Sequence, residues 1–364
     1  MQVREITSHI ESFAPLSYQE SYDNAGLQTG DPDQEVWGVL ICIDITDEVI
    51  EEALRLDTNL IISHHPLIFS GLKKLTGSNY TERLVIEAIR QNLSIYSAHT
   101  NLDSVHAGVN HKISEKLGLK NTTILVPKVD HLRKLVFFVP ADHADTVRQE
   151  IFKAGAGFIG AYDMCSFSAA GEGTFRGSST SNPYVGEKGT LNTEPELRVE
   201  TIFPKERENQ ITMALLQSHP YEEVAFDIYP LANKYHKAGS GAIGELEKSL
   251  DEQSFLGLLK ERFSTPVIRH SELLDKKIKK IALCGGSGSF LLPEAIASGA
   301  DVFVSGDFKY HQFFDADHRI LVADIGHYES EQFTKEIFYE LLTKKFTKFA
   351  VHLSEVNTNP VNYF

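Results

Sequence analysis

Short apolar runs alternate with amphipathic helical patterns at both ends of this 364-residue chain. Strands are predicted where β-rich runs of strand length occur, at residues 36–43, 59–62, 93–98, 280–284, 302–305 and 320–325. Helices are predicted where apolar residues recur at helical spacing, at 47–56, 81–91, 109–117, 291–297 and 330–345. This alternation is typical of an α/β sheet with helical crossovers, so we expect both ends to form one layered α/β core.

The middle of the chain follows another order. Its predicted elements are a strand at 134–139, a helix at 141–153, strands near 162–168 and 197–203, a helix at 206–217 and a strand at 224–229. This βαββαβ order is that of a ferredoxin-like fold. We therefore expect an inserted α+β domain at 128–236 between two parts of the core, 1–127 and 237–364. Inside the insert, the polar stretch 171–195 is too long for a hairpin turn and is predicted to be an ordered lid or a mobile loop.

Composition excludes several classes of protein. Hydrophobic residues make up 42% and charged residues 23% of the chain, as in globular proteins. The formal net charge of −15 argues against stable binding to nucleic acid or to anionic membranes. Apolar runs are far shorter than the roughly 18 residues of a membrane span. The N-terminus lacks the apolar segment of a secretory signal and the three cysteines form no CxxC, so we expect a cytoplasmic protein with free thiols.

Two adjacent histidines, His64 and His65, follow the predicted strand at 59–62. Ligands in open α/β sheets bind beyond the carboxyl ends of strands, so the pair stands where a site is expected. Imidazoles are common metal ligands, although two ordinary loop histidines would give the same pattern.

Two further strand ends supply similar side chains. The predicted strand at 93–98 runs directly into a segment with His99 and Asp103. The predicted strand at 320–325 is followed by His327 and Glu331. The last two residues are four positions apart at a predicted helix start, so their side chains share a face and can converge.

Five nitrogen and oxygen ligands are therefore expected at the same edge of one sheet: His64, His65, Asp103, His327 and Glu331. This number is too large for one tetrahedral zinc with an open position, whereas two divalent cations roughly 3.5 to 4 Å apart and bridged by carboxylates account for it. The donor types suit Zn, Fe, Mn, Ni and Co alike. His99 fits either a ligand or a residue that orients Asp103 or a bound water, and we take it as a catalytic candidate.

Three other segments have two interpretations each. The glycine-rich run at 284–290 is suited to cradling a phosphate or to tight packing, but it is no complete GxGxxG motif. His311, after the strand at 302–305, fits a proton shuttle or a structural histidine, and it is the second catalytic candidate. The polar segment at 22–27 is either a plain turn or a loop that lines the site.

Six segments together resemble the Nif-three-like family, whose members are commonly called GTP cyclohydrolase 1 type 2 homologues. These segments are Tyr-Asp-Asn-Ala-Gly-Leu at 22–27, Ser-His-His-Pro-Leu-Ile-Phe at 63–69, His-Thr-Asn-Leu-Asp at 99–103, Cys-Gly-Gly-Ser-Gly-Ser at 284–289, Gly-Asp-Phe-Lys-Tyr-His at 306–311 and Gly-His-Tyr-Glu-Ser-Glu at 326–331. The resemblance implies that the five expected ligands bind two divalent metals and that the protein forms a toroidal homohexamer. The insert, with His-Pro-Tyr-Glu-Glu at 219–223, is similar to the CutA/PII-like domain of longer bacterial members.

The sequence is consistent with two functions. The first is a metal-dependent hydrolase acting on a nucleotide or a phosphodiester, in which two cations polarise the scissile group and activate water. The second is a metal-binding or regulatory assembly protein without turnover. An open coordination position next to the ligands distinguishes the first from the second.

Overall fold

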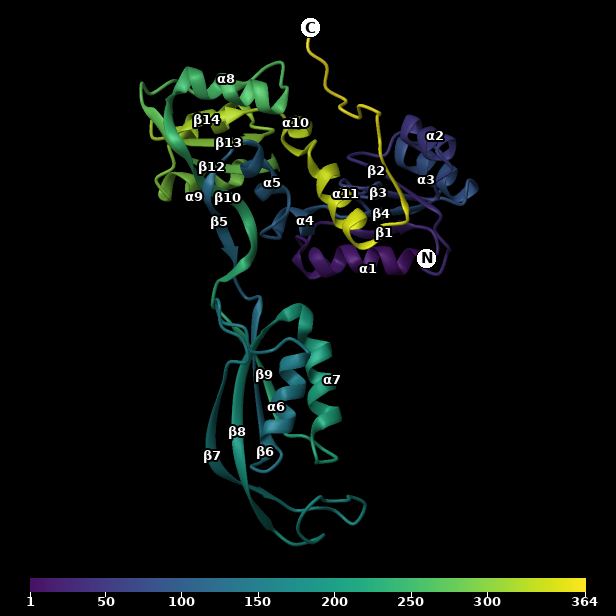
Figure 1. The fold of residues 1–364 in the computed structure, drawn as a ribbon, viewed down its shortest axis with the longest axis vertical. Helices are drawn as coiled ribbons and strands as arrows, with labels where there is room; N and C mark the ends of the chain where they lie inside the picture. The colour runs from purple at the N-terminus through teal and green to yellow at the C-terminus, as the bar shows by residue number, and fades with distance from the viewer. The chain divides into compact units, whose positions relative to one another are not determined.

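The computed structural model describes residues 1–364, which divide into two compact units (Figure 1). Unit 1 consists of Met1–Pro127 and His236–Phe364, and unit 2 consists of Lys128–Tyr235. Each unit has its own buried apolar core. No helix in either unit combines the length and the apolar character that a membrane span requires.

Unit 1 contains a five-stranded sheet whose four parallel strands are joined by helical crossovers. In spatial order its strands are β1 (Gly26–Thr29), β4 (Ser94–Ser97), β3 (Leu60–Ser63), β2 (Gly38–Cys42) and β15 (Ala350–Leu353). Only β1 runs antiparallel to its neighbour. The central strands β2, β3 and β4 are buried along their whole length, as expected for a parallel sheet covered on both faces.

Side chains alternate along these strands, and each set meets a different pair of helices. Leu40 and Ile61 pack under α2 (Asp47–Arg55) and α3 (Tyr80–Arg90). Ile41 and Ile62 face the core formed with α1 (Val3–Phe13) and α11 (Thr334–Lys345). Figure 1 shows these pairs on opposite faces of the sheet. Because successive strand residues point to opposite faces of the sheet and both sets are apolar here, each face is covered by the apolar side of a helix pair.

A six-stranded sheet forms the other part of unit 1. Its spatial order is β11 (Arg269–His270), β14 (Leu321–Asp324), β13 (Val302–Gly306), β12 (Lys277–Ser287), β10 (Tyr235–Asp251) and β5 (Lys120–Lys128). Strands β12, β13 and β14 are parallel, so their carboxyl ends lie at one edge. Helix α8 (Glu252–Phe263) packs on one face, and α9 (Leu292–Ala297) with the 3-10 helix η4 (Tyr310–Ala316) packs on the other.

Short helices connect the two sheets of unit 1. They are α4 (Thr100–Ser104), α5 (Val109–Lys116) and α10 (His327–Glu331). Each begins close to the carboxyl end of a parallel strand or in the segment that follows it. This is the edge of each sheet where a ligand site is expected.

Unit 2 consists of one antiparallel sheet with two helices on a single face. In chain order its elements are β6 (Leu132–Pro140), α6 (Ala144–Lys153), β7 (Ser166–Phe175), β8 (Asn192–Pro204), α7 (Glu208–Ser218) and β9 (Phe226–Leu231). The strands lie in the order β7-β8-β6-β9, and every neighbouring pair is antiparallel. Phe137 and Val199 of the sheet pack against Ile151 and Leu215 of the helices.

The expectation of one sheet was wrong, because the two ends of the chain contribute to two separate sheets. Strand β10, which contains several glycines, was not among the predicted strands. A Cβ at Gly239 would lie 2.2 Å from the Val126 carbonyl oxygen, so glycine is needed there for β5 to approach. The predicted helix at 330–345 is divided into α10 and α11. The two ends of the expected long loop at 171–195 belong to β7 and β8, and its larger part, 176–191, connects these strands.

Candidate metal centre

Two neighbouring parallel strands bring the first three candidate ligands together. Strand β3 ends at Ser63 and leads directly into His64 and His65. Strand β4 ends at Ser97, which lies opposite Ser63 in the sheet, and α4 then carries Asp103. The hydroxyl groups of the two serines are 2.8 Å apart, which holds the two strand ends in register below the site.

The other two candidate ligands come from the second sheet. Strand β14 leads through Gly326 into α10, whose first and last residues are His327 and Glu331. Gly326 has φ 93°, and a Cβ there would lie 2.1 Å from Oε2 of Glu329, so the tight approach requires glycine. One helical turn separates the two ligands, and His327 Nε2 lies 3.0 Å from Glu331 Oε2.

The five side chains converge around the buried Glu331 carboxylate. His65 Nε2 lies 3.0 Å from Glu331 Oε2 and 3.2 Å from His327 Nε2. His64 Nε2 lies 3.7 Å from Glu331 Oε1 and 3.6 Å from Asp103 Oδ1. The candidate ligand atoms of His64, His65 and Glu331 all lie within 4.8 Å of one another.

Each of the three histidines donates its Nδ1 proton away from this centre. His64 donates to the Ala98 carbonyl at 2.9 Å, His65 to Asp44 at 2.7 Å, and His327 to Asp307 at 2.7 Å. With Nδ1 as the donor, Nε2 of a neutral imidazole carries a lone pair that faces the centre. This is the arrangement by which proteins orient histidines that bind metals.

Two buried polar atoms at the centre have no hydrogen-bond partner in the protein, His64 Nε2 and Asp103 Oδ1. An unpaired buried polar atom costs roughly 1–3 kcal/mol, so two of them side by side need an explanation. A nitrogen lone pair and a carboxylate oxygen are both donors to a cation. The residues present therefore fit a bound divalent metal.

The pKa shifts of the candidate ligands in the metal-free protein also indicate that the cluster needs positive charge. Burial acts to lower the pKa of His65, but hydrogen bonds with Asp44 and Glu331 raise it to about 10. The pKa of His327 rises to about 11, since Glu331 and Asp307 outweigh its burial. Burial raises the pKa of Asp103 well above its usual value, and the nearby Glu331 charge adds to this. A bound cation would supply the charge that these protons supply in its absence.

A cavity of about 480 Å³ opens beside the ligands and is lined by residues of both sheets and of the segment at 20–22. Of the segment at 22–27, for which one of two interpretations was a loop that lines the site, Tyr22 is the residue that lines this cavity. Asp23 accepts hydrogen bonds from His99 Nδ1 at 2.8 Å and from the Thr100 amide at 3.0 Å. Burial would raise the pKa of Asp23, but these bonds bring it to about 2. His99 itself lines the cavity, with its ring centroid 5.4 Å from that of His65.

The glycine-rich run at 284–290, which begins in the last residues of β12, is used for packing. Its amides donate within the protein, Gly285 to Asn110 at 3.0 Å, Gly286 to Ser330 at 2.8 Å and Gly288 to Ser305 at 3.0 Å. These three N–H groups are not available to a phosphate. Instead they connect the run to α5, to β13 and to α10, the helix that carries Glu331.

Sequence reasoning did not identify Asp44 or Asp307, which hold His65 and His327 in orientation. A signal was present, because Asp44 closely follows β2 and Asp307 directly follows β13. Ligands in open α/β sheets bind beyond the carboxyl ends of strands. This rule identified His64, and it applies equally to acidic residues at the ends of neighbouring strands.

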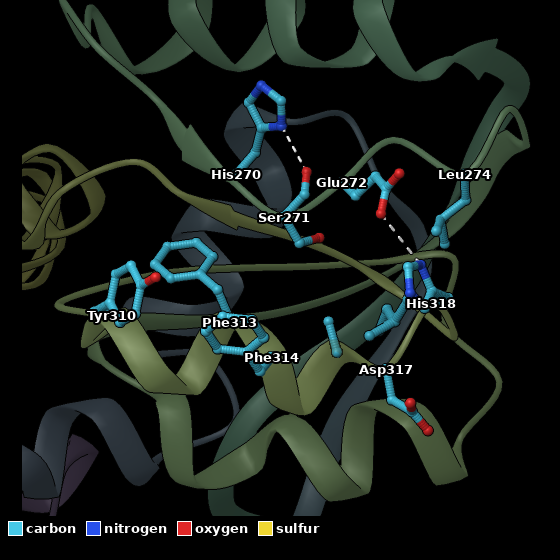
Figure 2. Close-up of a pocket in the computed structure, with 11 residues that line it drawn as sticks. His270, Ser271, Glu272, Leu274, Tyr310, Phe313, Phe314, Asp317 and His318 are labelled. Atoms are coloured by element: carbon cyan, nitrogen blue, oxygen red, sulfur yellow. Dashed lines mark hydrogen bonds and ion pairs between the residues drawn. The ribbon is translucent and has the colours of Figure 1, made fainter.

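His311 lies outside this cavity. It is an exposed residue of η4, and its ring contacts those of Tyr310 and Phe314. A hollow of about 560 Å³ lies along the same helix (Figure 2). Figure 2 shows Phe313 and Phe314 there, with His318 facing Glu272 at 3.4 Å in an exposed ion pair. No buried group with an unpaired polar atom faces this hollow, so it lacks the features of the metal centre.

Comparison with known proteins agrees with the resemblance. Residues 1–360 match the family Duf34/NIF3 (NGG1p interacting factor 3). The chain is 38% identical over 358 residues to the GTP cyclohydrolase 1 type 2 homolog of Halalkalibacterium halodurans, covering 97% of this chain and 96% of that protein. It is 36% identical over 370 residues to the Bacillus subtilis protein of that name, covering 99% and 98%. The crystal structure of a Bacillus cereus protein related to NIF3 superposes with a TM-score of 0.85, at 37% identity, covering 100% and 99%.

Proposed function

The chain belongs to the Duf34/NIF3 family, and from this premise we propose that it binds two divalent cations and acts as a hydrolase on a nucleotide or a phosphodiester. One observation carries the proposal. Three histidines anchored through Nδ1 direct Nε2 toward Glu331 and Asp103, and two of the buried donor atoms lack any partner. The name of these relatives, GTP cyclohydrolase 1 type 2 homolog, supports a nucleotide as the substrate.

The proposed ligands are the five residues of the converging cluster, His64, His65, Asp103, His327 and Glu331. Bound divalent cations would supply Lewis-acid polarisation of the substrate and activation of water near neutral pH. Asp44 and Asp307 would hold the imidazoles of His65 and His327 in orientation. The adjacent cavity favours catalysis over a purely structural site, because it leaves room for a substrate beside the ligands.

His99 is the proposed proton carrier. Asp23 accepts its Nδ1 proton, which leaves Nε2 of the neutral ring as a proton acceptor in the cavity wall. His311 stays a prediction of the sequence, and its position on η4 gives it no contact with the cavity in a single chain.

We further propose that unit 2 is a ferredoxin-like domain inserted into the α/β core. Its support is the βαββαβ order combined with the antiparallel strand order β7-β8-β6-β9 and two helices on one face. A toroidal homohexamer is proposed on the family resemblance, and light scattering coupled to size-exclusion chromatography tests for six copies.

Elemental analysis of protein purified without added metal, followed by a screen of nucleotides and phosphodiesters, tests the proposed function. Two equivalents of metal per chain together with hydrolysis of a compound in the screen support it. Two equivalents without turnover of any compound favour the alternative, a metal-binding protein that is not an enzyme. Failure to bind divalent metal at all, even after reconstitution, would overturn both.

A further inference from the structure

Three large aromatic side chains line the cavity beside the candidate ligands and are left exposed to solvent. The exposed fractions are 64% for Tyr22, 49% for Phe69 and 63% for Phe290. Tyr22 and Phe69 contact each other, with ring centroids 6.4 Å apart and planes tilted by 48°. Phe290 comes from the other sheet, in the 3-10 helix η3 (Ser289–Leu291) that follows β12. Exposed apolar side chains gathered in a hollow are typical of a binding site.

The charge of the cavity is unsuitable for a compound with several negative charges. No lysine or arginine is among the lining residues. The carboxylates of Asp103 and Glu331 stand at the centre, and Asp23, Asp44 and Asp307 stand directly behind the imidazoles. With two divalent cations bound and neutral imidazoles, these five carboxylates would still outweigh the four positive charges of the metals.

Backbone amides do not compensate for the missing basic side chains. The three amides of the glycine-rich run at Gly285, Gly286 and Gly288 are bonded within the protein. The one further acidic residue among the other lining residues is Glu20, and the rest include neutral polar groups such as the exposed Ser287 hydroxyl. Such groups suit ring nitrogens and carbonyl oxygens better than phosphates.

We propose that this cavity selects its ligand by a planar ring with hydrogen-bonding heteroatoms, stacked on Tyr22, Phe69 and Phe290, and that it takes nucleosides or free bases in preference to nucleoside polyphosphates. The inference rests on the proposed function for the location of the site, and it replaces the nucleotide as expected substrate by the part of a nucleotide that carries no phosphate. Stacking on aromatic side chains tolerates different bases, because every base has a flat face. The volume of about 480 Å³ lies within the range of small-molecule sites.

Calorimetric titration of the full-length, zinc-loaded protein with the four ribonucleosides and their triphosphates tests the inference. At least one nucleoside is expected to bind as tightly as its triphosphate or more tightly. Phe290→Ala and Tyr22→Ala are each expected to weaken that binding at least about fivefold. Tyr310→Ala is the matched control, since Tyr310 is 73% exposed and does not line this cavity.

Three outcomes would overturn the inference: no nucleoside binds, every triphosphate binds more tightly than its nucleoside, or both aromatic variants bind as the wild type does. Metal content, measured on every variant, separates this from the proposed function. If the wild-type protein holds no metal, the proposed function fails. The same titrations on the metal-free protein then decide whether the aromatic side chains bind a ring.

Discussion

Asp44 accepts the Nδ1 proton of His65 at 2.7 Å, and its second oxygen accepts a hydrogen bond from the Thr358 hydroxyl at 2.8 Å. Asp44 thus connects a candidate ligand to the C-terminal segment of the chain. These bonds bring the pKa of Asp44 below its usual value although burial alone would raise it. The carboxylate stays ionised, which makes His65 a better electron donor and fixes its ring.

Asp44→Asn is expected to weaken metal binding by about 10- to 100-fold, because the amide keeps the shape of the side chain but removes the charge behind His65. Competition with a chromophoric chelator measures the affinity. Thr358→Val should give a smaller loss in the same direction. Thr343→Val, on the exposed side of α11, should leave the affinity unchanged. Equal affinities for Asp44→Asn and wild type would contradict the role given to Asp44.

Removal of a proposed ligand should lower the metal content of the protein. His65→Ala and Glu331→Ala are each expected to hold fewer than two equivalents per chain, since no other side chain occupies the vacated position. His270→Ala, at an exposed histidine bonded to the Ser271 carbonyl, is the control and should keep the wild-type content. Two full equivalents in both ligand variants would exclude these residues from the site.

Sequence patterns predicted which residues follow the ends of strands, but they did not predict how the two sheets pack against each other. His64, His65 and Asp103 follow adjacent strands that are separated by one crossover, so the strand-end rule suffices to group them. His327 and Glu331 belong to the second sheet, and only packing between the sheets brings them to His65. Family membership is confirmed, whereas the five ligands and the two catalytic histidines stay predictions.

Glycines and buried acids were the least predictable features, because their roles depend on contacts between distant segments. Gly286 illustrates this. Its run fitted either a phosphate cradle or tight packing. The structure agrees with packing, because the Gly286 amide donates to Ser330 in α10 and the missing side chain makes room for Glu331. Asp44 depends on Thr358, more than 300 positions further along the chain, and no local pattern contains that pairing.

Gly286→Ala is expected to reduce both stability and metal binding. Gly286 has φ 59°, and an added Cβ would lie 2.3 Å from Oε1 of the buried Glu331. Gly118→Ala is the matched control, because Gly118 has φ 70° with nothing within 4 Å of the added atom. Both variants should lose about 1 kcal/mol of unfolding free energy to backbone strain. Only Gly286→Ala should also lose metal, and equal metal content in the two variants would refute the contact with Glu331.

Glu82 should make the stability of the protein depend on acid pH. Its carboxylate accepts hydrogen bonds from the Thr76 amide, the Thr76 hydroxyl and the Ser78 amide, which lower its pKa to about 2. A group with a lowered pKa in the folded state stabilises the protein fully above its ordinary pKa of 4.5, and this contribution is lost as the pH falls toward 2.

Urea unfolding of wild type and Glu82→Gln at several pH values measures this effect. The wild type should be more stable at pH 6, and the difference should shrink between about pH 4.5 and the lowest pH at which both proteins fold. Glu87→Gln, in the same helix, is the control. A difference that stays constant over this range would mean that the charge of Glu82 does not hold the segment at 76–78.

Deletion of residues 128–236 tests whether the α/β core is independent of unit 2. Strands β5 and β10 are neighbours in the six-stranded sheet and carry the chain out of unit 1 and back into it. They run antiparallel, because Gly239 lies against Val126 while Gly244 lies against Lys120. A short Gly/Ser linker can therefore join the two strand ends as a hairpin does.

We expect the deletion protein to fold and to bind two metals per chain, because all five proposed ligands and the cavity belong to unit 1. Unit 2 has a separate core, so its removal exposes none of the apolar residues that bury the metal centre. Elemental analysis and thermal unfolding measure the two properties, and turnover of a small and a bulky substrate measures access to the cavity. The deletion should change turnover of the bulky substrate more than that of the small one. Unfolding together with loss of metal would show that residues 128–236 are part of the core after all.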